Sequence, residues 1–273
     1  MCANCGHLLP TRYCAACGQR DFAHNPSAHV LVGELWDTFG TIDGKLVRTA
    51  SLLVTRPGAL TVEWLAGRRA PYLRPFNLYL TVSGAYFAAL AATFRPGQLV
   101  MPRTAEQRRE SERVRATFER KYGSVPPPQR VVMLGLGRFV ADPASGITAA
   151  MPTMPRVMFA LVPVLALLVQ LAFRKRGWRY PAHLYFALHV LAFYFAVSIV
   201  DRVAHSYGPP WVGSLANAAV GVATLVYLGF AMRRVYGGRR WVTVTRTLAI
   251  GSAFAFLAIL GVWVNAVLTL GLR

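Results

Sequence analysis

Long uncharged apolar runs dominate the second half of the chain. They cover residues 157–173, 182–200, 212–232 and 247–270, and a similar run covers 75–94. Each is close to the length of about 20 residues that an α-helix needs to cross the hydrocarbon of a bilayer. The pattern predicts an all-α membrane protein with about five transmembrane helices, and a helical membrane domain that extends from residue 75 to 273.

Ahead of the first run, residues 28–74 repeat apolar positions at spacings of three and four. Examples are Leu31, Leu35 and Phe39, then Leu46, Ala50 and Leu53, then Leu60, Trp64 and Leu65. This spacing is typical of amphipathic helices, and the Trp and Arg residues among them favour the membrane interface. We expect juxtamembrane helices here. The alternative is a small soluble helical domain that packs the same stripes inward.

The segment 95–156 is expected to lie outside the membrane. Residues 104–122 carry the charges of an exposed helix, which begins with a capping box at Thr104 and Gln107. Residues 131–151 are apolar, but three residues near the middle argue against a span: Arg138, Asp142 and Pro143. We expect a re-entrant or surface-lying stretch there.

Positive charge is concentrated in two short connectors. Residues 174–179 hold four Lys or Arg and residues 233–246 hold five, and neither connector contains an acid. Short loops of this kind stay in the cytosol, which predicts a cytoplasmic N-terminus and an outer Arg273. The same model places the basic segment 95–156 outside, although segments this long largely escape the rule. The net charge of +19 favours anionic lipid headgroups as partners, while nucleic acid is disfavoured as a partner.

All four cysteines lie in the first 17 residues, within a head that we place at residues 1–27. They form two copies of the pattern Cys-x-x-Cys-Gly, at Cys2, Cys5, Cys14 and Cys17. Two intervening residues let a tight turn aim both sulfurs at one ion, and the following glycine permits positive φ. Four thiolates are the ligand set of a structural zinc site. The sequence therefore predicts a zinc-ribbon-like head with structural zinc and no open coordination position.

No catalytic template accompanies this metal site. The sequence contains no nucleophile elbow, phosphate-binding loop, dinucleotide fingerprint or His-Glu-x-x-His motif. A redox dithiol pair is the alternative use of the cysteines, but the strand and helix of a thioredoxin-like site are missing from the pattern. We therefore expect a protein that is not an enzyme.

The apolar run at 182–200, the third along the chain, and the residues just after it contain ionisable side chains that could serve a function at membrane depth. They are His183, His189, Asp201 and His205. Asp201 and His205 lie four apart on one helical face, where they could bind a metal, relay a proton or cap the helix. The simpler interpretation is interfacial hydrogen bonding for His183, Asp201 and His205, and an interhelical contact for His189.

Several short stretches stand out beside the apolar runs: the paired Cys-x-x-Cys-Gly head with Gln19, the stretch Asp43-Gly44-Lys45, the stretch Gly67-Arg68-Arg69-Ala70-Pro71-Tyr72, and the pair His183 and His189. Together they resemble a family of bacterial membrane proteins that is classed only as a domain of unknown function. The resemblance implies a zinc-ribbon-like N-terminus, several helical spans and the bacterial inner (plasma) membrane. It implies no activity.

Together these patterns favour a non-enzymatic scaffold or interaction protein, whose cytosolic head and residues 28–74 bind another protein or a second copy. Residues 67–69 and the arginine-rich connectors are expected to attract anionic headgroups. The alternative is a small-molecule or lipid transporter, or a lipid-modifying membrane enzyme, that uses the polar residues of the third run. That alternative requires His189, Asp201 and His205 to converge on one polar cavity.

Overall fold

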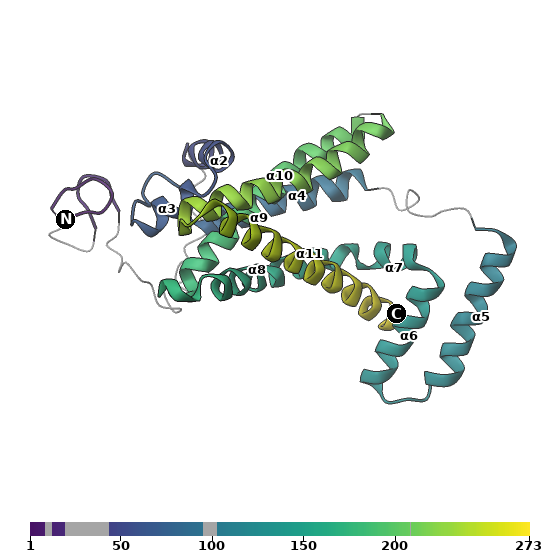
Figure 1. The fold of residues 1–273 in the computed structure, drawn as a ribbon. Coiled ribbons are helices and arrows are strands. Elements are labelled where there is room, and N and C mark those ends of the chain that lie inside the picture. Colours follow the sequence, from purple (N-terminus) through teal and green to yellow (C-terminus); the bar gives the residue numbers. More distant parts are fainter. Residues whose placement is uncertain (9–12, 20–43, 95–102, 208) are drawn as a thin grey trace. The chain divides into compact units, whose positions relative to one another are not determined.

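The computed structural model describes residues 1–8, 13–19, 44–94, 103–207 and 209–273. Regular structure within these residues is helical and includes no β-strand (Figure 1). The helices are α2 (Lys45–Thr55), α3 (Ala59–Leu65), α4 (Pro75–Thr93), α5 (Ala105–Tyr122), α6 (Pro127–Ala141), α7 (Pro143–Ala150), α8 (Met154–Ala172), α9 (Tyr180–Tyr207), α10 (Pro210–Tyr236) and α11 (Arg240–Gly271). The expected all-α fold is confirmed for this part of the chain, and the apolar stripe at 31–39 lies outside it.

Four stretches are long and apolar enough to cross a membrane: Pro143–Ala172, Tyr180–Ser206, Ala216–Tyr236 and Arg240–Gly271. They coincide with the four apolar runs of the second half, except that the first begins before residue 157. The helix α4, the expected first span, contains Asn77 and two tyrosines and is not among these four stretches. The structure thus supports a membrane protein with four candidate spans, and the count of about five is not confirmed.

The chain divides into two compact units. Unit 1 combines residues 1–93 with 162–252, and unit 2 combines residues 94–161 with 253–273. The boundaries expected at residues 27 and 74 from composition are not tested by this division and stay predictions.

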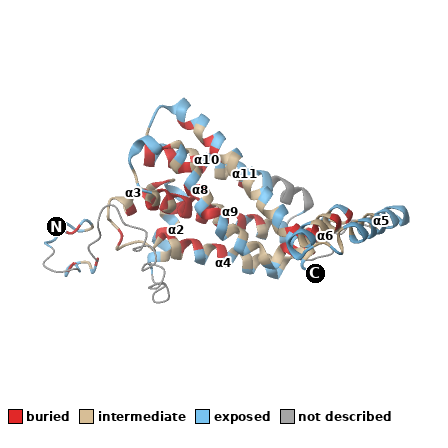
Figure 2. Cartoon of the chain, turned by 90° about the horizontal axis from the view of Figure 1, so that it is seen from below, coloured by how far each residue is buried: buried red, intermediate tan, exposed pale blue. Residues whose placement is uncertain are grey.

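Unit 1 is built around α9. This helix packs against α4, α10 and the short α3, and 67% of its most apolar stretch is buried, against 17% for α11 (Figure 2). A helix that is apolar on all sides is stable in the middle of a bundle. Aromatic rings fill the contacts: Phe193 stacks on Tyr227 at 3.8 Å between centroids, and Tyr79 meets Phe195 edge-on at 5.9 Å.

The amphipathic helices α2 and α3 bury the apolar stripes that their spacing predicts. Leu53, Leu60 and Trp64 are each less than 5% exposed. Trp64 of α3 contacts Tyr185 of α9 edge-on, with 5.9 Å between ring centroids. Gly58 precedes α3 with a φ of +76°, and a Cβ atom there would lie 2.9 Å from the backbone of Ala231 in α10. These stripes therefore pack against the apolar helices of unit 1.

Unit 2 contains the hairpin of α5 and α6. The capping box at its start is confirmed: the Gln107 N–H donates to Thr104 Oγ1 (3.2 Å), and the Thr104 N–H donates to Gln107 Oε1 (3.0 Å). The apolar stretch 131–151 is not one element, because it breaks at Asp142 between α6 and α7. Pro143 opens α7, and the Asp142 carboxylate accepts from the Ser145 N–H at 3.1 Å.

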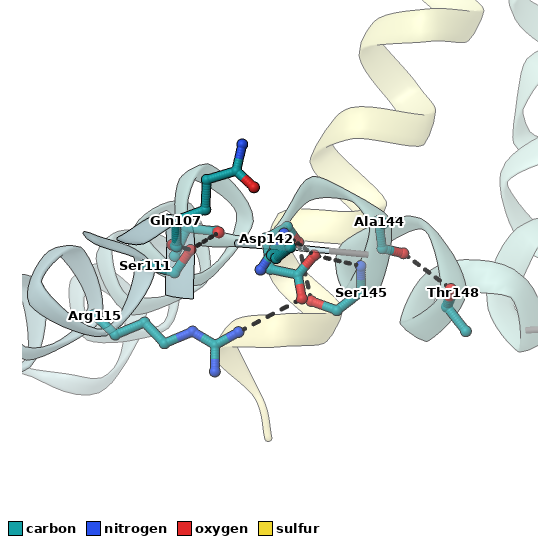
Figure 3. A network of polar contacts seen from close by, with 9 residues as sticks. Gln107, Ser111, Arg115, Asp142, Ala144, Ser145 and Thr148 are labelled. Atoms are coloured by element: carbon teal, nitrogen blue, oxygen red, sulfur yellow. Dashed lines mark hydrogen bonds and ion pairs between the residues drawn. The ribbon is translucent and has the colours of Figure 1, made fainter. Parts of the chain in front are cut away.

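The Asp142 carboxylate also contacts two arginines of unit 2, and Figure 3 shows Arg115 pointing toward it. Arg103 donates to the carboxylate at 2.6 Å, and Arg115 lies 3.8 Å away. Within the same unit, α6 approaches the C-terminal half of α11 so closely that a Cβ at Gly135 would overlap the Val267 carbonyl oxygen. Asp142 and Pro143, two of the three residues that argued against a span, therefore mark a helix break in unit 2.

Candidate metal centre

The two cysteine turns have the same backbone geometry, twelve positions apart. The N–H of Cys2 donates to the His7 carbonyl at 2.7 Å, and the N–H of Cys14 donates to the Gln19 carbonyl at 2.8 Å. In each turn the glycine after the second cysteine has positive φ, +76° at Gly6 and +68° at the equivalent Gly18. This conformation is open to glycine without strain. The expected role of both glycines is confirmed.

These turns bring the four sulfurs of Cys2, Cys5, Cys14 and Cys17 to within 4.8 Å of one another. The Cys2 and Cys17 sulfurs lie 3.7 Å apart, and those of Cys5 and Cys14 lie 3.5 Å apart. A tetrahedral zinc ion with bonds of about 2.3 Å separates its sulfurs by about 3.8 Å. None of the four is in a disulfide. The cluster could therefore hold a metal ion, and its spacing fits a tetrahedral S₄ site.

Backbone dipoles around the sulfurs favour thiolates in the second turn. A hydrogen bond from the backbone of Cys17 lowers the pKa of the Cys14 thiol, and one from Gln19 lowers the pKa of Cys17. At Cys5 the backbone of His7 acts in the same direction, but the neighbouring thiols and desolvation outweigh it and raise the pKa to about 12. A metal cation bound by the four sulfurs would favour the thiolate form of Cys5 as well, because metal ligation deprotonates a thiol.

Gln19 connects the cysteine cluster to the rest of unit 1. Its side chain is 9% exposed, and its Oε1 accepts from the backbone N–H groups of Arg69 and Ala70, both at 3.0 Å. Its Nε2 donates to the carbonyl of Gly67. Our sequence reasoning gave Gln19 no physical role. Its position directly after the second Cys-x-x-Cys-Gly is the one local signal that could have indicated it.

The turn that receives Gln19 is itself held by its arginines. Arg68 binds the carboxylate of Glu63 through two nitrogens, and this hydrogen bonding lowers the pKa of Glu63. Arg69 is 7% exposed, donates to the Trp64 carbonyl at 3.2 Å and lies over the indole ring. Both guanidinium groups, which we expected to attract lipid headgroups, therefore have contacts within the protein.

The polar residues of α9 form separate pairs. His183 Nδ1 lies 2.9 Å from Tyr236 Oη of α10, and His189 Nδ1 lies 2.9 Å from Thr61 Oγ1 of α3. The interhelical contact expected for His189 is confirmed, and His183 makes one as well. Asp201 lies 3.3 Å from His205 in the same helix. Because α9 is continuous, the offset of twelve positions from His189 to Asp201 places them about 18 Å apart along its axis.

One part of the chain matches a known protein family. Residues 43–87 match the model of a family described as "Protein of unknown function (DUF3667)". This stretch contains α2, α3, the turn that accepts Gln19 and the first part of α4. No curated protein sequence and no solved structure matches the chain.

Proposed function

We propose that the protein is a non-enzymatic scaffold of the bacterial inner membrane, with a structural zinc ion held by Cys2, Cys5, Cys14 and Cys17. The head and the juxtamembrane helices form one cytosolic platform for a partner protein or a second copy. The observation that carries this proposal is the set of three hydrogen bonds between the Gln19 side chain and the turn at residues 67–70. They join the cysteine cluster to helices that pack on α9.

Zinc supplies the folding energy of the head in this proposal. The described residues of the head are mostly exposed, apart from Cys2, Cys14 and Gln19. A segment of this size cannot bury enough apolar surface to fold alone, so metal binding stabilises it. With all four ligands from the protein, zinc has no open position for water or substrate, which is typical of a structural site.

The proposed topology has five spans, with α4 as the first and the N-terminus in the cytoplasm. The aromatic side chain of Trp241 is 82% exposed beside the basic connector, as suits an anchor at the headgroup level. Arg174, Lys175 and Arg176 are exposed in the other basic connector. We propose that these connectors attract anionic headgroups, at about 1 kcal/mol per basic residue.

The alternative of a transporter or lipid-modifying enzyme has less support. It requires His189, Asp201 and His205 to converge, whereas His189 is paired with Thr61 and Asp201 lies more than three helical turns away.

Full-length protein in detergent tests the proposal. Cys14→Ser with Cys17→Ser should abolish stoichiometric zinc, measured by elemental analysis, while the helical spectrum persists. Gln19→Ala should keep the zinc but increase hydrogen exchange at the amides of Arg69 and Ala70. His7→Ala is the matched control, because His7 is the exposed counterpart of Gln19 in the first turn. Retained zinc in the cysteine variant would refute the metal site, and unchanged exchange in Gln19→Ala would refute the docked head.

A further inference from the structure

A groove of about 360 Å³ lies between the end of α10 and the start of α11. The two helices are joined by the short connector 237–239 (Figure 1). Leu225 and Phe230 line one side of the groove, and Val244 and Leu248 line the other. All four side chains are between 38% and 61% exposed. The groove is therefore an open, apolar channel on the surface of unit 1.

The polar atoms inside the groove are already satisfied. The Thr247 hydroxyl donates to the Thr243 carbonyl at 2.8 Å, and the Thr243 hydroxyl donates to the Arg239 carbonyl at 3.2 Å. Across from Thr247, α10 contributes Gly229, where a Cβ would lie 3.5 Å from the Thr247 hydroxyl oxygen. The groove presents carbon and no free hydrogen-bonding group along this stretch, so its middle suits a hydrocarbon chain.

Two arginines line the same groove where the helices are joined. They are Arg233, in the last turn of α10, and Arg240, the first residue of α11. Within the described residues neither guanidinium has an ion pair or a hydrogen bond, in contrast to Arg234, which donates to the Pro57 carbonyl at 2.8 Å. The sequence contains no Asp or Glu after Asp201. The groove therefore ends in positive charge that α10 and α11 do not neutralise.

We propose that this groove binds one anionic phospholipid, with an acyl chain along the apolar channel and the phosphate between Arg233 and Arg240. Guanidinium groups bind phosphate through paired hydrogen bonds, and basic pockets between membrane helices on the cytoplasmic side suit anionic lipids. The exposed Trp241 adjoins Arg240 at the level where indole rings meet headgroups. The inference rests on the proposed membrane topology and is independent of the zinc head.

Other occupants fit the groove less well. A second copy bound symmetrically through this face would bring its own Arg233 and Arg240 against the first pair, and like charges repel. An apolar helix of another protein would fill the channel but leave both arginines without a counter-ion. A phospholipid satisfies the carbon surface and the charge in one molecule.

The experiment measures lipid binding to the full-length protein in detergent by native mass spectrometry, with phosphatidylglycerol and phosphatidylcholine as probes. Arg233→Gln with Arg240→Gln should weaken phosphatidylglycerol binding by roughly tenfold or more, since each basic residue contributes to attraction. Gly229→Leu should weaken it as well, because a Cβ fits there in ordinary contact and a longer side chain fills the channel. Arg179→Gln with Arg239→Gln removes the same charge outside the groove and should weaken phosphatidylglycerol binding clearly less, because it reduces only the diffuse attraction to the connectors.

Three unfavourable results of this experiment would lead to three different conclusions. Equal loss in both arginine pairs would overturn the site and leave only diffuse attraction to the connectors, as the proposed function already states. Equal affinity of the native protein for both lipids would overturn the site and the headgroup proposal together. A native dimer that Gly229→Leu dissociates, without loss of lipid, would assign the groove to a second copy.

Discussion

The Nδ1 atom of His189 lies 2.9 Å from the hydroxyl of Thr61, and both residues are at most 2% exposed. This hydrogen bond joins the central helix α9 to α3, which belongs to the matched region at residues 43–87. It ties the juxtamembrane helices to the bundle by a polar contact within an apolar environment, where an unpaired group is costly.

Loss of this hydrogen bond should destabilise unit 1. Thr61→Val keeps the shape of the side chain but leaves the His189 nitrogen unpaired, at a cost of about 1–3 kcal/mol. Denaturant unfolding in detergent measures the effect. Thr55→Val is the control, because the exposed Thr55 hydroxyl bonds only within its own helix. Equal stability of the two variants would contradict a structural role for the His189 contact.

The approach of α3 to α10 should depend on the glycine at position 58. Gly58→Ala places a side chain on a residue with a φ of +76° and within 2.9 Å of the Ala231 backbone, so we expect destabilisation of about 1–3 kcal/mol. Thermal unfolding in detergent measures it. Gly44→Ala, where nothing lies within 4 Å of the new Cβ, should unfold like the native protein. A tolerated Gly58→Ala would show that α3 is not held against α10.

The helix break in unit 2 should respond differently to two changes at Asp142. Asp142→Asn keeps the cap on Ser145 but loses the charge that binds Arg103, whereas Asp142→Ala loses both. Since a lost N-cap costs about 1 kcal/mol, Ala should destabilise more than Asn. Limited proteolysis around residue 142 measures the local opening of the helix break, with both variants treated at the same protease concentration. Identical cleavage of the two variants would exclude a capping role.

Acid should weaken the turn that receives Gln19. Hydrogen bonding from Arg68 holds the pKa of Glu63 below its ordinary value of 4.5. The ion pair therefore contributes fully above that value, and the contribution is lost as pH falls through the lowered pKa. Native protein should lose protection of the Arg68 amide in this acidic range, measured by hydrogen exchange. Glu63→Gln should have lower protection at neutral pH and little further loss in acid, and parallel profiles would refute the assignment.

The topology predicts opposite accessibility for two engineered cysteines. In a chain whose native cysteines are replaced by serine, Glu110→Cys should react with a membrane-impermeant maleimide on intact cells, because segment 95–156 is expected outside. Arg239→Cys, in a cytosolic connector, should react only after permeabilisation. Both side chains are exposed, so burial does not confound the comparison. The reverse result would place segment 95–156 in the cytosol.

Local patterns predicted much of this architecture. The capping box at Thr104, the positive φ of Gly6 and Gly18, and the apolar runs are decided by neighbouring residues, so the sequence is sufficient to read them. The hydrogen bonds of Gln19 and His183 could not be predicted from local patterns, because their partners at positions 67–70 and 236 are far away in the sequence. The count of about five spans is not confirmed, because α4, the expected first span, is not among the four stretches that are long and apolar enough to cross a membrane.

The packing of α4 on α9 has a consequence for biosynthesis. A ribosome completes α4 well before it reaches α9, so Leu78 and Tyr79, which are buried in the finished bundle, leave the ribosome without their partner surface. During this interval the exposed apolar side chains of α4 can associate with the wrong partners. A transcript truncated before α9 should therefore yield a fragment that membrane proteases degrade rapidly.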